Sequence, residues 1–145
     1  MISIILQTVA RTEDDTTAFT ARCREIIPAG SVVCLHGTLG AGKTFFVKRF
    51  AEMVGIKNAA SPTFAIVNVY QGDLKINHFD FYRIRKKEEL LDIGLYEYTS
   101  DEDAITFIEW ADMYPELLPR HRFELTIDLP EPHLRKITLS KVDDE

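Results

Sequence analysis

Gly37-Thr38-Leu39-Gly40-Ala41-Gly42-Lys43-Thr44 is the stretch from which the fold can be predicted. The octet matches Gly-x-x-x-x-Gly-Lys-Ser/Thr at every fixed position, which is expected by chance in about 1 % of chains of this length. In such a loop the glycines let backbone N–H groups point inward toward phosphate oxygens. Lys43 supplies a cation to the β- and γ-phosphates, and the Thr44 hydroxyl can bind Mg²⁺. The octet therefore predicts a site for a nucleoside triphosphate and magnesium.

The sequence on either side supplies the strand and the helix that a phosphate loop requires. Residues 31–36 form a short apolar, β-branched run directly before the octet. After it, apolar residues recur at helical spacing until Gly55 provides a stop. One face of this helix carries Phe46, Phe50, Met53 and Val54.

The rest of the chain alternates between strand and helix patterns. Thr12, with an acid three residues later, indicates a helix that continues to about Ile27. Strands are expected at 2–9, 65–70, 74–79, 104–108, 123–129 and 135–140, and short helices at 86–93 and between Pro115 and Pro119. The second and third strands form a hairpin, so the sheet is mixed, and the nearly all-apolar run 104–108 is expected to be buried on both faces. The predicted fold is one α/β domain over residues 1–145, a layered sandwich of the P-loop NTPase type.

Composition and charge narrow the class of protein. The 145 residues are 46 % hydrophobic and 28 % charged, as in an ordinary globular domain, and the formal net charge is -6. An acidic chain is not attracted electrostatically to the phosphate backbone of a nucleic acid, so partner proteins are expected to bind any nucleic acid involved. Cys23 and Cys34 lack metal-ligand or redox spacing and are expected to be small buried hydrophobes in a reducing compartment. Met1 to Leu6 is too short for a signal peptide and no apolar run approaches a membrane span, so the expected location is the cytoplasm.

Two acidic residues follow apolar strands and are candidates for the carboxylate that a phosphate loop needs for Mg²⁺. Glu109 follows the more completely apolar strand and is the better candidate for a metal ligand. Asp80 would then polarise or position the attacking water, or hold a metal-bound water. Each is alternatively a solvated carboxylate at the end of a strand.

Several residues near these acids have open roles. Thr63, in Ser61-Pro62-Thr63-Phe64, either senses Mg²⁺ or the γ-phosphate or simply opens the next strand. His78 either polarises Asp80 or fills a strand position, and the strand position is favoured. The basic residues at 83 and 85–87 are interpreted as a solvated face rather than as a contact for substrate or nucleic acid.

Taken together, these motifs resemble the bacterial TsaE (YjeE) family. The resemblance rests on the octet, Ser61-Pro62-Thr63-Phe64, His78-Phe79-Asp80-Phe81-Tyr82-Arg83, Glu88-Glu89-Leu90 with Ile93-Gly94-Leu95, and Ile108-Glu109-Trp110, in this order and spacing. It covers about residues 12–119. The octet alone would fit many nucleotide-binding families, whereas the His-x-Asp-x-Tyr-Arg and Glu-Trp elements are specific.

The resemblance implies a small ATPase needed to make threonylcarbamoyladenosine next to the anticodon of certain tRNAs. It implies the partners TsaB and TsaD, with tRNA reached only through that complex, and a role in resetting TsaD between turnovers. By motif, Gly37 to Thr44 bind ATP, Thr44 and Glu109 hold Mg²⁺, and hydrolysis depends most on Asp80. Trp110 lies beside the metal site, and Glu13 is placed near the adenine. Family members commonly carry Asp at the position of Thr38 and a hydroxyl residue at that of Phe45, neither of which has a fixed phosphate-loop role.

The expected reaction is hydrolysis of ATP to ADP and phosphate. The chain has no insertion long enough for the mobile lid with which small-molecule kinases exclude water. No arginine can be assigned firmly as an arginine finger, although Arg83 is the best internal candidate, so slow turnover alone and completion of the site by partners are expected. Two other classes stay open: a small P-loop nucleoside or metabolite kinase, and a guanine-nucleotide switch. The switch is disfavoured because Asn58, Asn68 and Asn77 are not followed by Lys-x-Asp.

Overall fold

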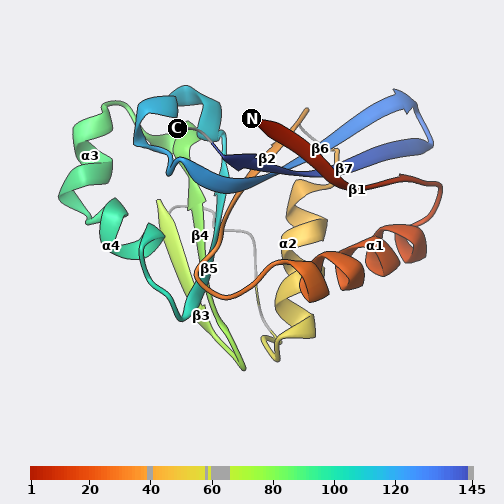
Figure 1. Cartoon of the computed structure of the whole chain (residues 1–145), viewed down its shortest axis with the longest axis horizontal. Coiled ribbons are helices and arrows are strands. Elements are labelled where there is room, and N and C mark those ends of the chain that lie inside the picture. The colour runs from red at the N-terminus through yellow and green to blue at the C-terminus, as the bar shows by residue number, and fades with distance from the viewer. Residues whose placement is uncertain (39–40, 58, 60–65, 144–145) are drawn as a thin grey trace.

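The computed structural model describes residues 1–38, 41–57, 59 and 66–143 (Figure 1). The strands are β1 (Ile2–Ala10), β2 (Val32–Gly37), β3 (Val67–Gln71), β4 (Lys75–Asp80), β5 (Ala104–Glu109), β6 (His121–Glu131) and β7 (Leu134–Asp143). The α-helices are α1 (Glu13–Ile26), α2 (Lys43–Met53), α3 (Lys87–Asp92) and α4 (Leu95–Thr99). Short 3₁₀ helices are η1 (Phe81–Arg83), η2 (Ala111–Met113) and η3 (Pro115–Leu117).

A single seven-stranded sheet runs through the molecule in the order β1-β7-β6-β2-β5-β4-β3. The central strands β6, β2, β5 and β4 are parallel to one another. Strand β3 pairs antiparallel with β4 on one side, and on the other side β7 pairs antiparallel with β6 and β1 antiparallel with β7. The short connection 72–74 between β3 and β4 can join only antiparallel strands, which accounts for the antiparallel pair on this side of the sheet. The predicted α/β fold with a mixed sheet is confirmed.

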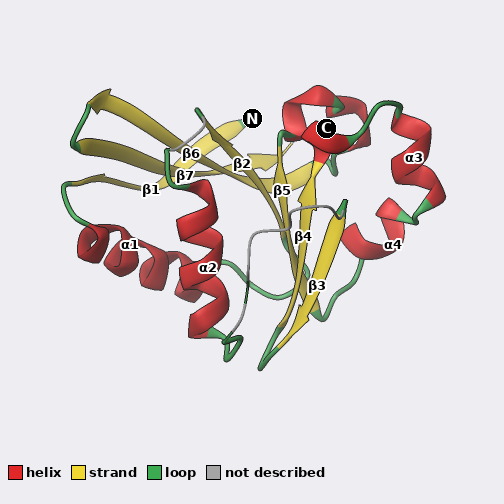
Figure 2. Cartoon of the chain, turned by 180° about the vertical axis from the view of Figure 1, so that it is seen from behind, coloured by secondary structure: helices red, strands yellow, loops and turns green. Residues whose placement is uncertain are grey.

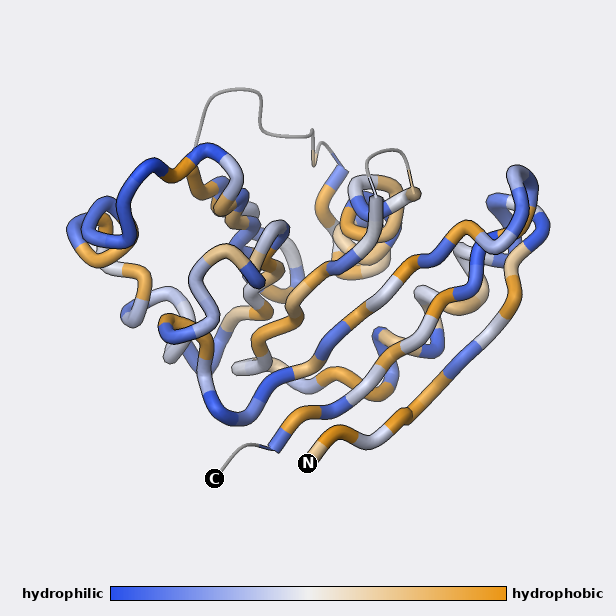
Figure 3. Tube along the Cα trace, turned by 90° about the horizontal axis from the view of Figure 1, so that it is seen from above, coloured by the Kyte–Doolittle hydropathy of each residue, from blue (hydrophilic) through white to orange (hydrophobic). Residues whose placement is uncertain are grey.

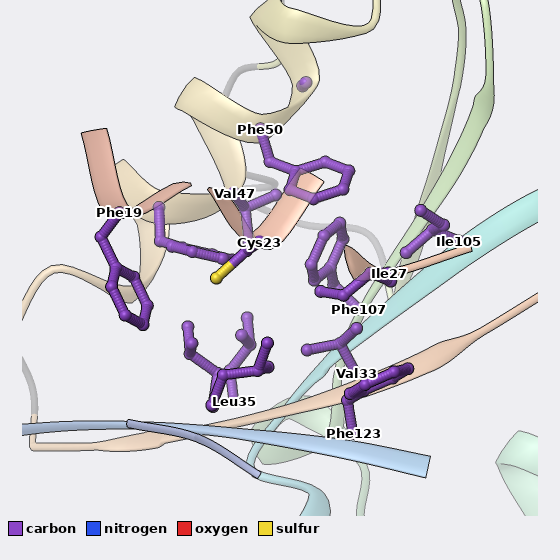
Figure 4. Close-up of a cluster of buried hydrophobic side chains, with 14 of the residues drawn as sticks. Phe19, Cys23, Ile27, Val33, Leu35, Val47, Phe50, Ile105, Phe107 and Phe123 are labelled. Atoms are coloured by element: carbon purple, nitrogen blue, oxygen red, sulfur yellow. The ribbon is translucent and has the colours of Figure 1, made fainter. Parts of the chain in front are cut away.

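Helices cover both faces of this sheet (Figure 2). Helices α1 and α2 pack on one face over a cluster of buried residues that includes Leu35, Phe50 and Phe107 (Figure 4). The other face carries α3, α4 and the 3₁₀ helices over a second cluster. Strand β5 contributes to both clusters, with Phe107 on the first and Ile108 on the second, as predicted for a strand buried on both faces.

Contacts between aromatic rings fix α2 against β5. The ring of Phe107 on β5 lies 5.1 Å from that of Phe50 and 6.2 Å from that of Phe46, both in edge-to-face arrangement. All three side chains are fully buried. Helix α2, which follows the octet at residues 37–44 (the glycine loop), is therefore held in a defined position against β5, the strand that ends at Glu109.

The two cysteines are buried, as the sequence predicts. Cys23 and Cys34 are free and buried, and this burial raises the pKa of each thiol to about 12, which keeps both in the neutral form. No helix in the described part of the chain is long and apolar enough to cross a membrane.

The later strands and α4 differ from the prediction. Strands β6 and β7 extend beyond residues 123–129 and 135–140, and β6 passes through Pro130 because the pairing register shifts between Asp128 and Glu131. Figure 3 shows hydrophobic and hydrophilic residues alternating along the terminal strands. Gly94 ends α3 as expected, yet a further helix starts directly after it because Leu95 is buried in the second cluster.

The amino end of α1 offers a local test of stability. The Thr12 hydroxyl accepts a hydrogen bond from the Asp15 N–H at 3.1 Å, and the Asp15 carboxylate accepts one from the Thr12 N–H at 3.2 Å. This is the capping box that the sequence predicts. We expect Thr12→Ala to lower the free energy of unfolding by about 1 kcal/mol in urea titrations. Thr17→Ala, inside the same helix, is the matched control and should change it by less than about 0.5 kcal/mol. Equal losses in the two variants would contradict the capping role.

Candidate functional site

The glycine loop joins the end of β2 to the start of α2. Gly37 has φ +150, and a Cβ there would lie 2.7 Å from the carbonyl oxygen of Ile127 on the neighbouring strand β6. Gly42 precedes α2 with φ +115, a left-handed conformation that side chains disfavour. No side chain of the described residues caps α2, so its first N–H groups point out of the helix end, where an anion can accept them. Leu39 and Gly40, two residues of the octet, lie outside the described residues.

Lys43 links this loop to the end of β5. It is the first residue of α2, and its side chain is buried. The ammonium nitrogen lies 4.6 Å from the centre of the Trp110 ring, within the range of a cation–π contact. Trp110 directly follows β5 in a left-handed conformation with φ 59, and its ring lies 5.0 Å from that of Tyr82. Lys43 and Trp110, expected near one site, are therefore in contact.

The two candidate carboxylates lie side by side. Asp80 ends β4 and Glu109 ends β5, and the two residues are register partners in adjacent parallel strands. Glu109 is also the register partner of Leu35 on β2, two residues before Gly37. Because side chains alternate along a strand, Glu109 projects from the same face as Phe107, which packs on α2. Both carboxylates are thus on the face of the sheet that carries the glycine loop and α2.

The two carboxylates have different partners. Glu109 Oε2 lies 2.7 Å from Nε2 of His78, whose side chain is only 3 % exposed. Asp80 Oδ1 accepts a hydrogen bond from the Tyr82 N–H at 3.0 Å, and Oδ2 lies 3.5 Å from Nε of Arg83. The sequence favours a plain strand position for His78, or contact with Asp80; in the structure its ring contacts Glu109 instead. Asp80 bonds locally because it caps η1.

The donor groups fit magnesium. The described residues contain no group of three or more His, Cys, Asp or Glu side chains that could hold a metal ion by themselves. Magnesium bound with a nucleotide does not require one, since one or two carboxylates together with phosphate oxygens and water usually complete its shell. Thr44 is exposed in the first turn of α2, and Glu109 stands at the end of a neighbouring strand. A hydroxyl and a carboxylate are therefore both present beside the loop.

Arg135 is a residue of this site that sequence analysis missed. It lies near the start of β7, and its Nε donates a hydrogen bond of 2.8 Å to the carbonyl oxygen of Ala41 in the glycine loop. A small pocket of about 100 Å³ adjoins it, lined by Glu13, Thr16, Gly42, Phe45, Ile127 and Arg135. Glu13, the residue placed near the adenine, therefore borders the glycine loop. No local motif marks Arg135, because 94 positions separate it from Ala41.

A charged cluster lies on the opposite face of the strand that leads to the loop. His36, next to Gly37, contacts Glu124 on β6, and Arg122 Nε donates to the same carboxylate at 3.0 Å. Burial opposes ionisation of Glu124, but the hydrogen bonds from His36 and Arg122 hold its pKa below the ordinary value. The Glu124 carboxylate thus stays ionised, and its contact with His36 joins β6 to β2 behind the loop.

The remaining candidates are at the periphery. Arg83, Arg85, Lys86 and Lys87 are all exposed, as expected for a solvated basic face. Thr63, the residue with a possible sensing role, lies outside the described residues. The prediction for Thr63 therefore stays a prediction.

Comparisons with known proteins identify relatives along most of the chain. The family model described as "Threonylcarbamoyl adenosine biosynthesis protein TsaE" matches residues 10–137. A tRNA threonylcarbamoyladenosine biosynthesis protein TsaE from Bacillus subtilis is 37 % identical over 131 residues, covering 89 % of this chain and 81 % of that protein. The TsaE protein of Treponema pallidum is 34 % identical over 136 residues, covering 93 % of this chain and all of that protein. The crystal structure of Bacillus subtilis YdiB superimposes with a TM-score of 0.81 and 32 % identity, covering 98 % of this chain and 88 % of that chain.

Proposed function

Because the chain belongs to the TsaE family of threonylcarbamoyladenosine biosynthesis proteins, we propose that it is the ATP-hydrolysing component of this tRNA modification machinery and acts with TsaB and TsaD. The observation that carries the proposal is the glycine loop between β2 and α2, whose lysine reaches across to the tryptophan that follows Glu109. This contact supports the proposal, because it brings the lysine of the loop close to the end of β5, where Glu109 lies.

In this proposal each residue of the site has a distinct task. The N–H groups at the start of α2 and the Lys43 ammonium bind the phosphates of ATP. Thr44 and Glu109 hold Mg²⁺, which supplies positive charge to the phosphate oxygens as charge develops on them. Glu13 borders the side of the loop on which the adenine is expected. Asp80, which remains in contact with Tyr82 and Arg83, orients the water that attacks the γ-phosphate.

Slow hydrolysis by the isolated chain follows from the same arrangement. The Arg83 guanidinium lies beside the Asp80 carboxylate, and Arg135 donates a hydrogen bond to the carbonyl oxygen of Ala41. In this arrangement neither arginine is assigned to the γ-phosphate. An arginine that stabilises the transition state can contribute a factor of about 10³–10⁵ in rate, and partners can supply one in trans. The acidic net charge of -6 also favours contact with tRNA through TsaB and TsaD rather than directly.

The test is to measure phosphate release by the purified chain alone and with TsaB and TsaD added. We expect the partners to raise the rate by at least about tenfold, a threshold set well below the factor of about 10³–10⁵ that a complete arginine finger can contribute. Lys43→Ala in the same mixture is the control that assigns the hydrolysis to this chain. Full-speed hydrolysis alone, unchanged by the partners, would contradict partner coupling, and a phosphorylated metabolite in place of free phosphate would indicate a kinase.

A further inference from the structure

The contact between His78 and Glu109 has no role in the function proposed so far. His78 lies on β4 and Glu109 at the end of β5, and their side chains are 3 % and 12 % exposed. Nε2 of the histidine and Oε2 of the carboxylate are 2.7 Å apart. Among the described residues, the other carboxylate oxygen, Oε1, accepts no hydrogen bond. One oxygen of a nearly buried carboxylate is therefore held by the histidine, and no group in the described part of the chain donates to the second.

We propose that His78 is a positioning residue for the magnesium ligand Glu109. The ring donates its Nε2–H to Oε2, which fixes the rotation of the carboxylate and leaves Oε1 for the metal ion. This inference rests on the proposed function, because it takes Glu109 as a ligand of Mg²⁺. Carboxylates that bind metals are commonly held by such hydrogen bonds, and loss of the outer partner typically lowers metal affinity about 10- to 100-fold.

The other charged groups near Glu109, Asp80 and Lys43, have other contacts, so His78 is the residue that orients its carboxylate. Asp80, the register partner of Glu109, directs its oxygens at the Tyr82 N–H and toward Arg83. Lys43 directs its ammonium at the Trp110 ring, and no ion pair joins Lys43 to Glu109 among the described residues. A lysine or arginine partner would compete with a metal cation for the carboxylate, whereas a single ring N–H orients it without competing for Oε1.

The His-x-Asp spacing at residues 78–80 agrees with this role of His78. Residues two apart in a strand project from the same face, so His78 and Asp80 both face the glycine loop. Phe79 between them projects to the opposite face, where it is fully buried in the second cluster. The His-x-Asp pattern thus places one residue against Glu109 and another beside it, and both depend on the register between β4 and β5.

The experiment measures how magnesium changes nucleotide affinity. A non-hydrolysable ATP analogue is titrated calorimetrically into the chain in excess EDTA and at increasing MgCl₂. For His78→Ala we expect the MgCl₂ concentration that gives half of the affinity gain to rise about tenfold or more, with the affinity in EDTA unchanged within about twofold. His78→Gln, whose amide nitrogen can take the place of Nε2, should largely restore the wild-type response, whereas the shorter His78→Asn should not.

The outcomes separate this inference from the proposed function. If wild type and Glu109→Ala respond equally to MgCl₂, Glu109 is not a ligand and the proposed metal site fails. If Glu109→Ala loses the response but His78→Ala keeps it, or if His78→Ala weakens binding equally in EDTA, the positioning role is wrong. Should His78→Ala not fold, ¹⁵N correlation spectra of the histidine rings in the wild type decide: an Nε2 of His78 without a proton would overturn the proposal, and a protonated Nε2 that is protected from exchange would support it.

Discussion

Replacing Lys43 with alanine is expected to lower ATP turnover by about 10²–10³-fold, the range seen when one preorganised donor to a transition-state charge is removed. Lys43 is buried at the first position of α2, so its ammonium is held close to the amino end of the helix. Affinity for ATP should fall as well, because a hydrogen bond to a charged group contributes about 1.5–3 kcal/mol. Both losses come from removing one cation from the phosphate-binding end of the helix.

The measurement is steady-state phosphate release together with calorimetric titration of the ATP analogue. Lys48→Ala is the matched control, since Lys48 lies on the same helix but is exposed to solvent. It removes the same charge from the chain and should leave both quantities within about twofold of wild type. Wild-type turnover in Lys43→Ala would overturn the assignment of the glycine loop as the phosphate site.

Replacing Asp80 is expected to separate binding from hydrolysis. Asp80→Asn should lower turnover by about 10²–10⁴-fold, as the loss of a group that positions or polarises the nucleophile does, and should leave affinity for the ATP analogue nearly unchanged. Asparagine retains a side-chain oxygen for the Tyr82 N–H but loses the charge that faces Arg83. The local structure around η1 is therefore preserved while the carboxylate is removed.

Asp80→Ala is the companion variant in the same assays. It also removes the cap of η1, so any difference between the alanine and asparagine variants reports the structural part of the role. A collapse of nucleotide affinity in Asp80→Asn would show instead that Asp80 is a metal ligand. Unchanged turnover in both variants would remove Asp80 from the catalytic site.

Local patterns in the sequence were sufficient to predict most elements of the fold. The strand–loop–helix unit around the octet, the capping box at Thr12 and the β3–β4 hairpin all depend on residues within a few positions of each other. The helix α4 was missed because it is only Leu95–Thr99 and depends on burial of Leu95 rather than on its own propensity. Short elements that rely on tertiary packing leave little trace in sequence periodicity.

The contacts within the site depend on the register of the sheet and could not be predicted in the same way. His78 reaches Glu109 across 31 positions, and Arg135 reaches Ala41 across 94. Strand order and the hairpin formed by β6 and β7 bring these residues together, and no spacing in the chain encodes either. The sequence could identify the acidic residues at the ends of strands, but it could not show which neighbour each one contacts.

The hydrogen bond from Arg135 to the Ala41 carbonyl makes the final strand a support of the glycine loop. Strand β7 lies beyond the parallel strands and outside the octet, and it pairs with both β6 and β1. A minimal fragment chosen by its motifs alone would retain every residue of the octet but would lose Arg135, which holds the backbone of the octet at Ala41. Designers who transplant this loop into another scaffold would need to bring a guanidinium from a distant strand with it.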